Sequence, residues 1–144
     1  RSNVFDIALL ARRLASAANW VRQQPNLQNL PIGYFGASTG AAAALVAAAA
    51  DPAISAIVSR GGRPDLAREA LPLVRAPTLL LVGSLDGPVI GLNQQAFDAL
   101  NGPKKIHIVP GAGHLFEEPG TLQQVIAHAS SWFIVHFARK QVRG

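Results

Sequence analysis

Residues 31–50 read PIGYFGASTGAAAALVAAAA. The short apolar run Ile32–Phe35 predicts a buried strand, and the alanine-rich run Thr39–Ala50 predicts a helix that ends at Asp51-Pro52. Between them lies Ser38, in the pattern G-x-S-x-G. A serine at such a junction either projects from a strained turn as a nucleophile or only caps the helix that follows.

The rest of the chain continues the alternation of strand and helix. Apolar residues at helical spacing predict an amphipathic helix over Val4–Gln23. The further predicted strands are Ile54–Ser59, Pro77–Val82 and Lys105–Val109, and the further predicted helices are Pro64–Leu71, Val89–Leu100 and Gly120–Arg139. The strand sequences are largely unbroken apolar runs, as in strands that helices cover on both faces. We therefore expect one α/β domain over residues 1–144, with three layers and a mostly parallel sheet flanked by helices.

Composition excludes several classes of protein. The 144 residues contain no cysteine, so disulfides, thiol catalysis and zinc-thiolate sites are excluded. The formal charge of +5 is spread along the chain, which argues against a dedicated nucleic-acid-binding face. The apolar run 41–50 is half as long as a membrane-spanning helix needs to be. We expect a cytoplasmic protein with neither a nucleic-acid nor a membrane partner.

The sequence also predicts no metal or organic cofactor. The glycine-rich turn before the alanine-rich helix lacks the lysine of a phosphate-binding loop and the G-x-G-x-x-G spacing of dinucleotide sites. His128 and His136 lie eight residues apart on one predicted helix, and His107 lies within a predicted strand. No third ligand accompanies the helical pair, so we expect these histidines to be structural.

Three polar residues follow predicted strands in the order serine, acid, histidine: Ser38, Asp86 and His114. The carboxyl ends of parallel strands meet at one edge of a sheet, so these side chains can come together. A histidine can take the proton of a serine hydroxyl, and a carboxylate can fix the histidine tautomer. The backbone N–H of Thr39, at the start of the next helix, would then point at the oxyanion. We expect the flanking glycines Gly36 and Gly40 to allow the close packing that this turn requires.

Each of these residues also has a structural interpretation. Ser38 could be a helix cap, and Asp86 could belong to an Asp-Gly-Pro turn, in which case Asp65 or Glu117 could supply the acid. His114 could be a loop histidine without a partner. The order of the three residues along the chain, each just after a strand, favours the catalytic interpretation.

Two arginines follow another predicted strand at the same edge of the sheet. Arg60 and Arg63 could bind a carboxylate or phosphate of a substrate. Alternatively, both could be solvated loop charges or could pair with Asp65 and Glu69.

The motifs GYFGASTG at residues 33–40, LVGSLD at 81–86 and GHLFE at 113–117 resemble the α/β-hydrolase superfamily, most closely its dienelactone-hydrolase-like branch. The resemblance implies that Ser38 is the nucleophile, Asp86 the acid, His114 the general base and Thr39 the first oxyanion donor. It implies a serine hydrolase that cleaves small ester or thioester substrates through an acyl-enzyme. Related sequences also occur fused to or beside phosphoribosyltransferase-like domains.

The chain departs from this family in two respects. Dienelactone hydrolases tend to have cysteine at the position of Ser38, which favours ordinary esters over lactones as substrates. The family fold also begins with strands, and with a loop supplying a second oxyanion N–H, that precede the first predicted helix and are absent here. We therefore expect Ile32–Phe35 to form a sheet edge that a second copy, or an upstream segment of a longer parent, covers. The alternative is a catalytically weak or inactive domain of this fold that serves in binding or assembly.

Overall fold

The computed structural model describes residues 2–143, and the side chains of residues 6–138. It confirms the predicted alternation of strand and helix. In chain order the elements are α1 (Ser2–Gln23), β1 (Gly33–Ala37), α2 (Thr39–Ala49), β2 (Ala56–Arg60), the 3₁₀ helix η1 (Pro64–Leu73), β3 (Thr78–Gly83), α3 (Gly87–Ala99), β4 (Lys104–Val109) and α4 (Thr121–Arg143).

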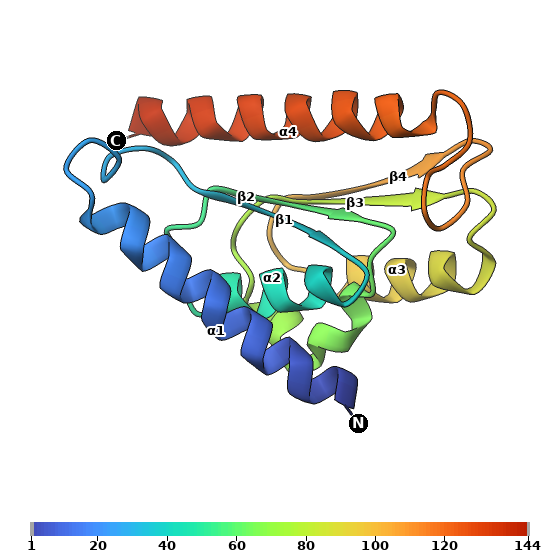
Figure 1. Ribbon diagram of the computed structural model, residues 1–144, viewed down its shortest axis with the longest axis horizontal. Helices are drawn as coiled ribbons and strands as arrows, with labels where there is room; N and C mark the ends of the chain where they lie inside the picture. Colours follow the sequence, from blue (N-terminus) through green and yellow to red (C-terminus); the bar gives the residue numbers. More distant parts are fainter. Residues whose placement is uncertain (1, 144) are drawn as a thin grey trace.

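The four strands form one parallel sheet in the order β1-β2-β3-β4. Each strand pairs with the next one along the chain, so right-handed crossovers place the connecting elements α2, η1 and α3 on the same face. The helix α4 lies along the opposite face (Figure 1). The result is the predicted three-layer α/β arrangement, and β1 is an edge of the sheet as expected.

Both faces of the sheet are apolar because both are covered. Along β3, Leu80 belongs to the cluster under α2 and α3, while Leu79 and Leu81 belong to the cluster under α4. All six residues of β3 are buried. This explains why the strand sequence is continuously apolar rather than alternating.

The alanine-rich helix α2 is the centre of the larger core. Residues 41–45 of this helix have no exposed surface. Alanine side chains are so small that α1 and η1 can both pack closely against α2. The hydroxyl of Tyr34 on β1 also contacts the carbonyl of Leu14, which fixes α1 across the end of the sheet.

The segment after β2 differs most from its predicted form. Instead of a regular α-helix, Pro64–Leu73 is a 3₁₀ helix interrupted at Arg68, whose φ is 49°. Pro72 lacks the N–H that an α-helix would use at that position.

In the part of the chain that the structure describes, no helix combines the length and apolar character required to span a membrane.

Candidate active site

Ser38 occupies a strained turn between β1 and α2. Its φ of 52° and ψ of −127° lie outside the regions that residues with a side chain ordinarily adopt. The Ser38 side chain makes no capping hydrogen bond to α2, so the simple cap interpretation does not describe its role. Its carbonyl accepts hydrogen bonds from the backbone N–H groups of Ala41 and Arg63, at 3.2 and 3.0 Å, and these fix the turn from two sides.

The two glycines of the motif differ in what they do. A Cβ on Gly36 would lie 2.5 Å from the carbonyl oxygen of Gly40 and 2.7 Å from the backbone nitrogen of Ala41. Gly36 is therefore required for the close approach of β1 to the start of α2. A Cβ on Gly40 would meet no heavy atom within 4 Å. The expectation that Gly40 also permits close packing is wrong, because its α-carbon faces open space.

The structure brings the side chains of Ser38, His114 and Asp86 together. The hydroxyl of Ser38 lies 3.2 Å from Nε2 of His114, and Nδ1 of His114 lies 2.8 Å from Oδ2 of Asp86. An ionised carboxylate can only accept, so the Asp86 contact places the imidazole proton on Nδ1. The unprotonated Nε2 then accepts the hydrogen bond of the Ser38 hydroxyl, which is the arrangement that a general base requires.

The acids considered as substitutes for Asp86 lie elsewhere. Asp65 accepts two hydrogen bonds from the guanidinium of Arg63, and Glu117 is exposed. The Asp86 side chain is only 12% exposed, against 41% for that of His114. The Asp86 carboxylate is thus shielded from solvent while the His114 imidazole remains accessible. This is the arrangement expected of a carboxylate that orients a general-base histidine.

The loop that carries His114 is fixed by a contact that the sequence analysis missed. Oε1 of Glu118 accepts a hydrogen bond of 3.0 Å from the backbone N–H of Gly113. This bond is the main reason that the pKa of the Glu118 carboxyl lies below its usual value. Phe116, at a φ of 55°, buries its ring beneath the same loop. Only the fold of the loop reveals these contacts, since no spacing rule links Glu118 to Gly113.

Gly61 provides the space that the His114 loop occupies. It follows β2 with a φ of 53°, and a Cβ there would lie 3.0 Å from the carbonyl oxygen of His114. Its own N–H is bonded to the carbonyl of Leu81, so the backbone cannot move away easily. A glycine at this position therefore allows the histidine loop to settle against the end of β2.

Thr39 is the first residue of α2, and Ser38 is its N-cap. The first N–H groups of a helix have no partner within it, and the helix dipole favours negative charge there. The Thr39 N–H is therefore placed where it could donate a hydrogen bond to an anionic oxygen next to Ser38.

Arg60 and Arg63 lie at the same edge of the sheet, but only one of them is paired with an acid. Arg63 forms a two-pronged ion pair with Asp65, with N–O distances of 3.0 and 2.9 Å. The side-chain hydrogen bond to Asp65 raises the pKa of Arg63 above its ordinary value. The guanidinium of Arg60 instead lies over the ring of Phe116, 5.8 Å from its centre. These contacts favour the pairing alternative for Arg63 and leave Arg60 as the better candidate for binding an anion.

The remaining histidines lie away from Ser38. His107 on β4 stacks against His128 on α4, with ring centres 3.9 Å apart, and His136 packs edge-on against Trp132. Among the residues that the structure describes, no three histidine or acidic side chains are grouped so that they could hold a metal ion.

Comparison with known proteins extends this description. The profile of the dienelactone hydrolase family matches residues 4–135, which is most of the chain and includes Ser38, Asp86 and His114. The chain belongs to the dienelactone hydrolase family. Family membership accounts for the parallel sheet with helices on both of its faces.

Three similar proteins are longer than this chain, which spans less than two thirds of the first two. It is 56% identical to a dienelactone hydrolase of Anabaena variabilis, with a TM-score of 0.91, and it covers 62% of that chain with 92% of its own. It is 59% identical over 138 residues to a Mycobacterium tuberculosis protein provisionally named a phosphoribosyl transferase, of which it spans 31% with 94% of its own length. An esterase domain from Rhodothermus marinus shares the fold at 20% identity and a TM-score of 0.72, covering 67% of that chain and 85% of this one.

Proposed function

We propose that this dienelactone hydrolase family member is a serine hydrolase that cleaves small ester or thioester substrates through an acyl-enzyme. The observation that carries the proposal is the contact of the Ser38 hydroxyl with Nε2 of His114, whose other nitrogen is bonded to Asp86. The backbone strain at Ser38 supports it, because strained residues that the surrounding structure holds in place are concentrated at functional sites.

In the proposed reaction, Oγ of Ser38 attacks the carbonyl carbon of the substrate while its proton passes to Nε2 of His114. Asp86 stabilises the imidazolium that forms. His114 then gives the proton to the departing alcohol or thiol as the carbonyl is restored, which leaves an acyl group on Ser38. A water molecule attacks this acyl group, returns a proton to Ser38 by way of His114, and releases the carboxylic acid.

The negative oxygen of the tetrahedral intermediate needs hydrogen-bond donors. The Thr39 N–H is one, because it begins α2 beside Ser38. We propose that a segment packed along the β1 edge provides the second donor. Each donor of this kind is worth on the order of 10²–10³ in rate, so the 144 residues alone should turn over slowly.

The β1 edge carries apolar surface suited to such packing. Phe35 on β1 is 49% exposed, and Leu30 just before the strand is 53% exposed. An open apolar strand edge favours pairing with another strand. We propose that a second copy of the chain or an upstream segment of a longer parent covers it, and the longer relatives are consistent with the second source.

The substrate proposal includes one anionic group. Arg60 lies at the end of β2 over Phe116, close to the loop of His114, and its ordinary charge is not used in an ion pair within the described residues. We propose that it contacts a carboxylate on the substrate.

Hydrolysis of p-nitrophenyl acetate by the Ser38→Ala variant tests the proposal. The variant should lose the activity and keep the far-ultraviolet circular dichroism spectrum of the parent, because the hydroxyl makes no capping bond that holds α2. Ser130→Ala is the matched control, since Ser130 is exposed on α4, and it should retain full activity. Equal activity of the Ser38→Ala variant and the parent would favour the alternative of a binding or assembly domain.

A further inference from the structure

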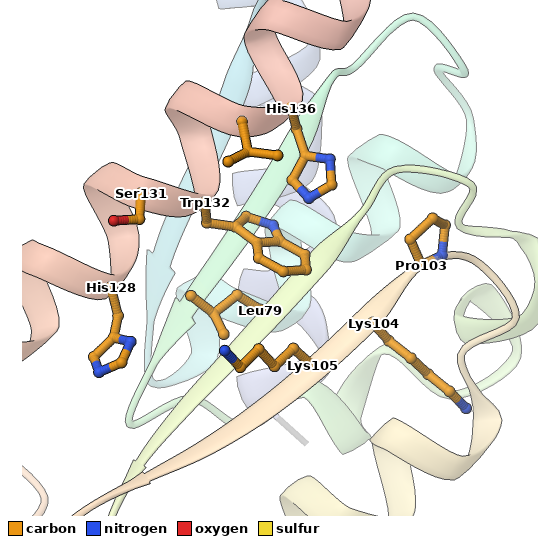
Figure 2. A pocket seen from close by; sticks show the side chains of 9 residues that line it. Leu79, Pro103, Lys104, Lys105, His128, Ser131, Trp132 and His136 are labelled. Atoms are coloured by element: carbon orange, nitrogen blue, oxygen red, sulfur yellow. The ribbon is translucent and has the colours of Figure 1, made fainter.

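A pocket of about 550 Å³ lies between α4 and the amino ends of β3 and β4. It is lined by Leu79, Pro103, Lys104, Lys105, His128, Ser131, Trp132, Val135 and His136 (Figure 2). Because the strands are parallel, this end of the sheet is opposite the edge that carries Ser38 and His114. The pocket is therefore separate from the proposed active site.

The polar lining of the pocket is basic. It includes two lysines and two histidines, and no aspartate or glutamate belongs to the described lining. Alternation along β4 places Lys105 on the same face as His107, whose ring stacks on His128 of α4. Burial, then the charges of His128 and Lys105, lower the pKa of His107. Positive charge is thus concentrated where β4 meets α4, and an anion would reduce the repulsion.

The two lysines are not equivalent. Nζ of Lys104 donates a hydrogen bond of 2.8 Å to the carbonyl of Phe97 and lies 4.5 Å from the centre of the Phe97 ring. Figure 2 shows its side chain directed away from Trp132. Lys105 therefore provides the ammonium group on the α4 side, and Lys104 is engaged with α3.

The apolar part of the pocket lining is built around the ring of Trp132. The indole N–H of Trp132 donates to the carbonyl of Pro77 at 3.2 Å, so its hydrogen-bonding requirement is met and its ring orientation is fixed. His136 packs edge-on against this ring at 4.4 Å between centres. Leu79 and Val135 complete an apolar wall. A fixed aromatic ring beside cationic side chains suits a ligand that is flat and apolar at one end and anionic at the other.

We propose that this pocket binds a small organic anion, in which a flat apolar ring lies against Trp132 and a carboxylate or phosphate group is held by Lys105 and His128. The volume is within the range of sites for small molecules, roughly 300–1,000 Å³. The site does not depend on Ser38 being catalytic, so its test and the esterase test can fail separately.

Isothermal titration calorimetry with phenyl phosphate and with benzoate tests the site on the purified protein. At least one probe should bind, and the stronger one identifies the preferred anionic group. Lys105→Gln should weaken that binding about 10- to 100-fold, the effect of losing a charged hydrogen bond. The matched variant Lys104→Gln should change it less than about twofold, because its ammonium is bonded to Phe97. Circular dichroism of both variants should match that of the parent, since both lysines are exposed.

Four results would overturn the proposal. The first is that neither probe binds at millimolar concentration, and the second is that the two lysine variants lose affinity equally. The third is that benzyl alcohol, which keeps the ring without the charge, binds as tightly as the anions. The fourth is that inorganic phosphate binds as tightly as phenyl phosphate. The first and third results would exclude an anion site, the second would exclude the position at Lys105, and the fourth would exclude the contribution of Trp132.

Discussion

Replacing Gly36 with alanine tests the packing that places Ser38. The new Cβ would lie 2.5 Å from the Gly40 carbonyl oxygen and 2.7 Å from the Ala41 nitrogen. Both are backbone atoms and cannot rotate away, so β1 and α2 must separate. Overpacking of this kind costs about 1–3 kcal/mol, and at about 2–4 °C per kcal/mol the melting temperature should fall by roughly 2–12 °C. Movement of the hydroxyl away from His114 by 1 Å should reduce turnover about 10²-fold.

The matched control is Gly40→Ala in the same motif. A Cβ there meets no heavy atom within 4 Å, and Gly40 is the second residue of α2. Alanine is more favourable than glycine in a helix by roughly 0.5–1 kcal/mol, so this variant should be slightly more stable than the parent. Urea denaturation of the parent and both variants measures the difference. If Gly36→Ala were as stable as the parent, or if both variants were destabilised equally, the steric account of the turn would be refuted.

Four further predictions concern the proposed active site. Asp86→Asn should lower kcat for p-nitrophenyl acetate on the order of 10³–10⁴-fold, because an amide no longer fixes the tautomer of His114; a loss of less than tenfold would contradict that role. Glu118→Ala should lower kcat by up to about 10²-fold through misplacement of the His114 loop. Glu118→Gln should retain activity, because its side-chain oxygen still accepts a hydrogen bond from the Gly113 N–H. Equal losses in the two variants would show that this hydrogen bond does not position the loop. The pKa of Glu118 is lowered in the folded protein, so the stability it contributes is complete above its unfolded pKa and is lost as pH falls through the folded value. The melting temperature of the parent should therefore fall more steeply across that acidic window than the melting temperature of Glu118→Gln, and parallel curves would contradict this contribution. Arg60→Ala should raise KM for a carboxylate-bearing ester far more than for its neutral analogue, and a uniform rise would exclude anion recognition.

The β1 edge gives a prediction about assembly. If a second copy covers this edge, sedimentation of the 144-residue chain should show a dimer, and specific activity should fall on dilution as the second oxyanion donor is lost. A monomer at micromolar concentration with full, dilution-independent turnover would contradict both the covered edge and the missing donor. A weakly active monomer that gains activity when joined to its upstream segment would identify that segment as the cover.

Much of the fold was predictable because it depends on patterns of apolar residues within short segments of the sequence. Unbroken apolar runs indicate strands covered on both faces, and β3 shows why, since its side chains alternate between two buried clusters. The positions of Ser38, Asp86 and His114 just after β1, β3 and β4 were enough to predict that they come together, because parallel strands end at one edge. These inferences required only spacing and topology.

What the sequence did not reveal depends on loop geometry and on packing angles. The Glu118 contact arises from the turn of its loop back to Gly113, and the different roles of Gly36 and Gly40 depend on which α-carbon faces its neighbour. The sequence left open whether Arg63 is solvated, binds a substrate anion or pairs with Asp65. The pairing with Asp65 depends on the turn that starts η1. The pocket beside Trp132 is formed by side chains of α4 together with the amino ends of β3 and β4, an arrangement that no residue pattern specifies.

Covalent labelling of the protein with phenylmethylsulfonyl fluoride, followed by mass spectrometry of its peptides, is the most direct measurement. Only an activated serine hydroxyl displaces fluoride at neutral pH, so the account predicts one adduct per chain, on the peptide that contains Ser38. The adduct should be nearly absent from a His114→Ala variant, because Nε2 of His114 is the base 3.2 Å from the hydroxyl. A parent protein in which Ser38 stays unmodified, or a His114→Ala variant labelled as fast as the parent, would contradict the assignment of Ser38 as the nucleophile.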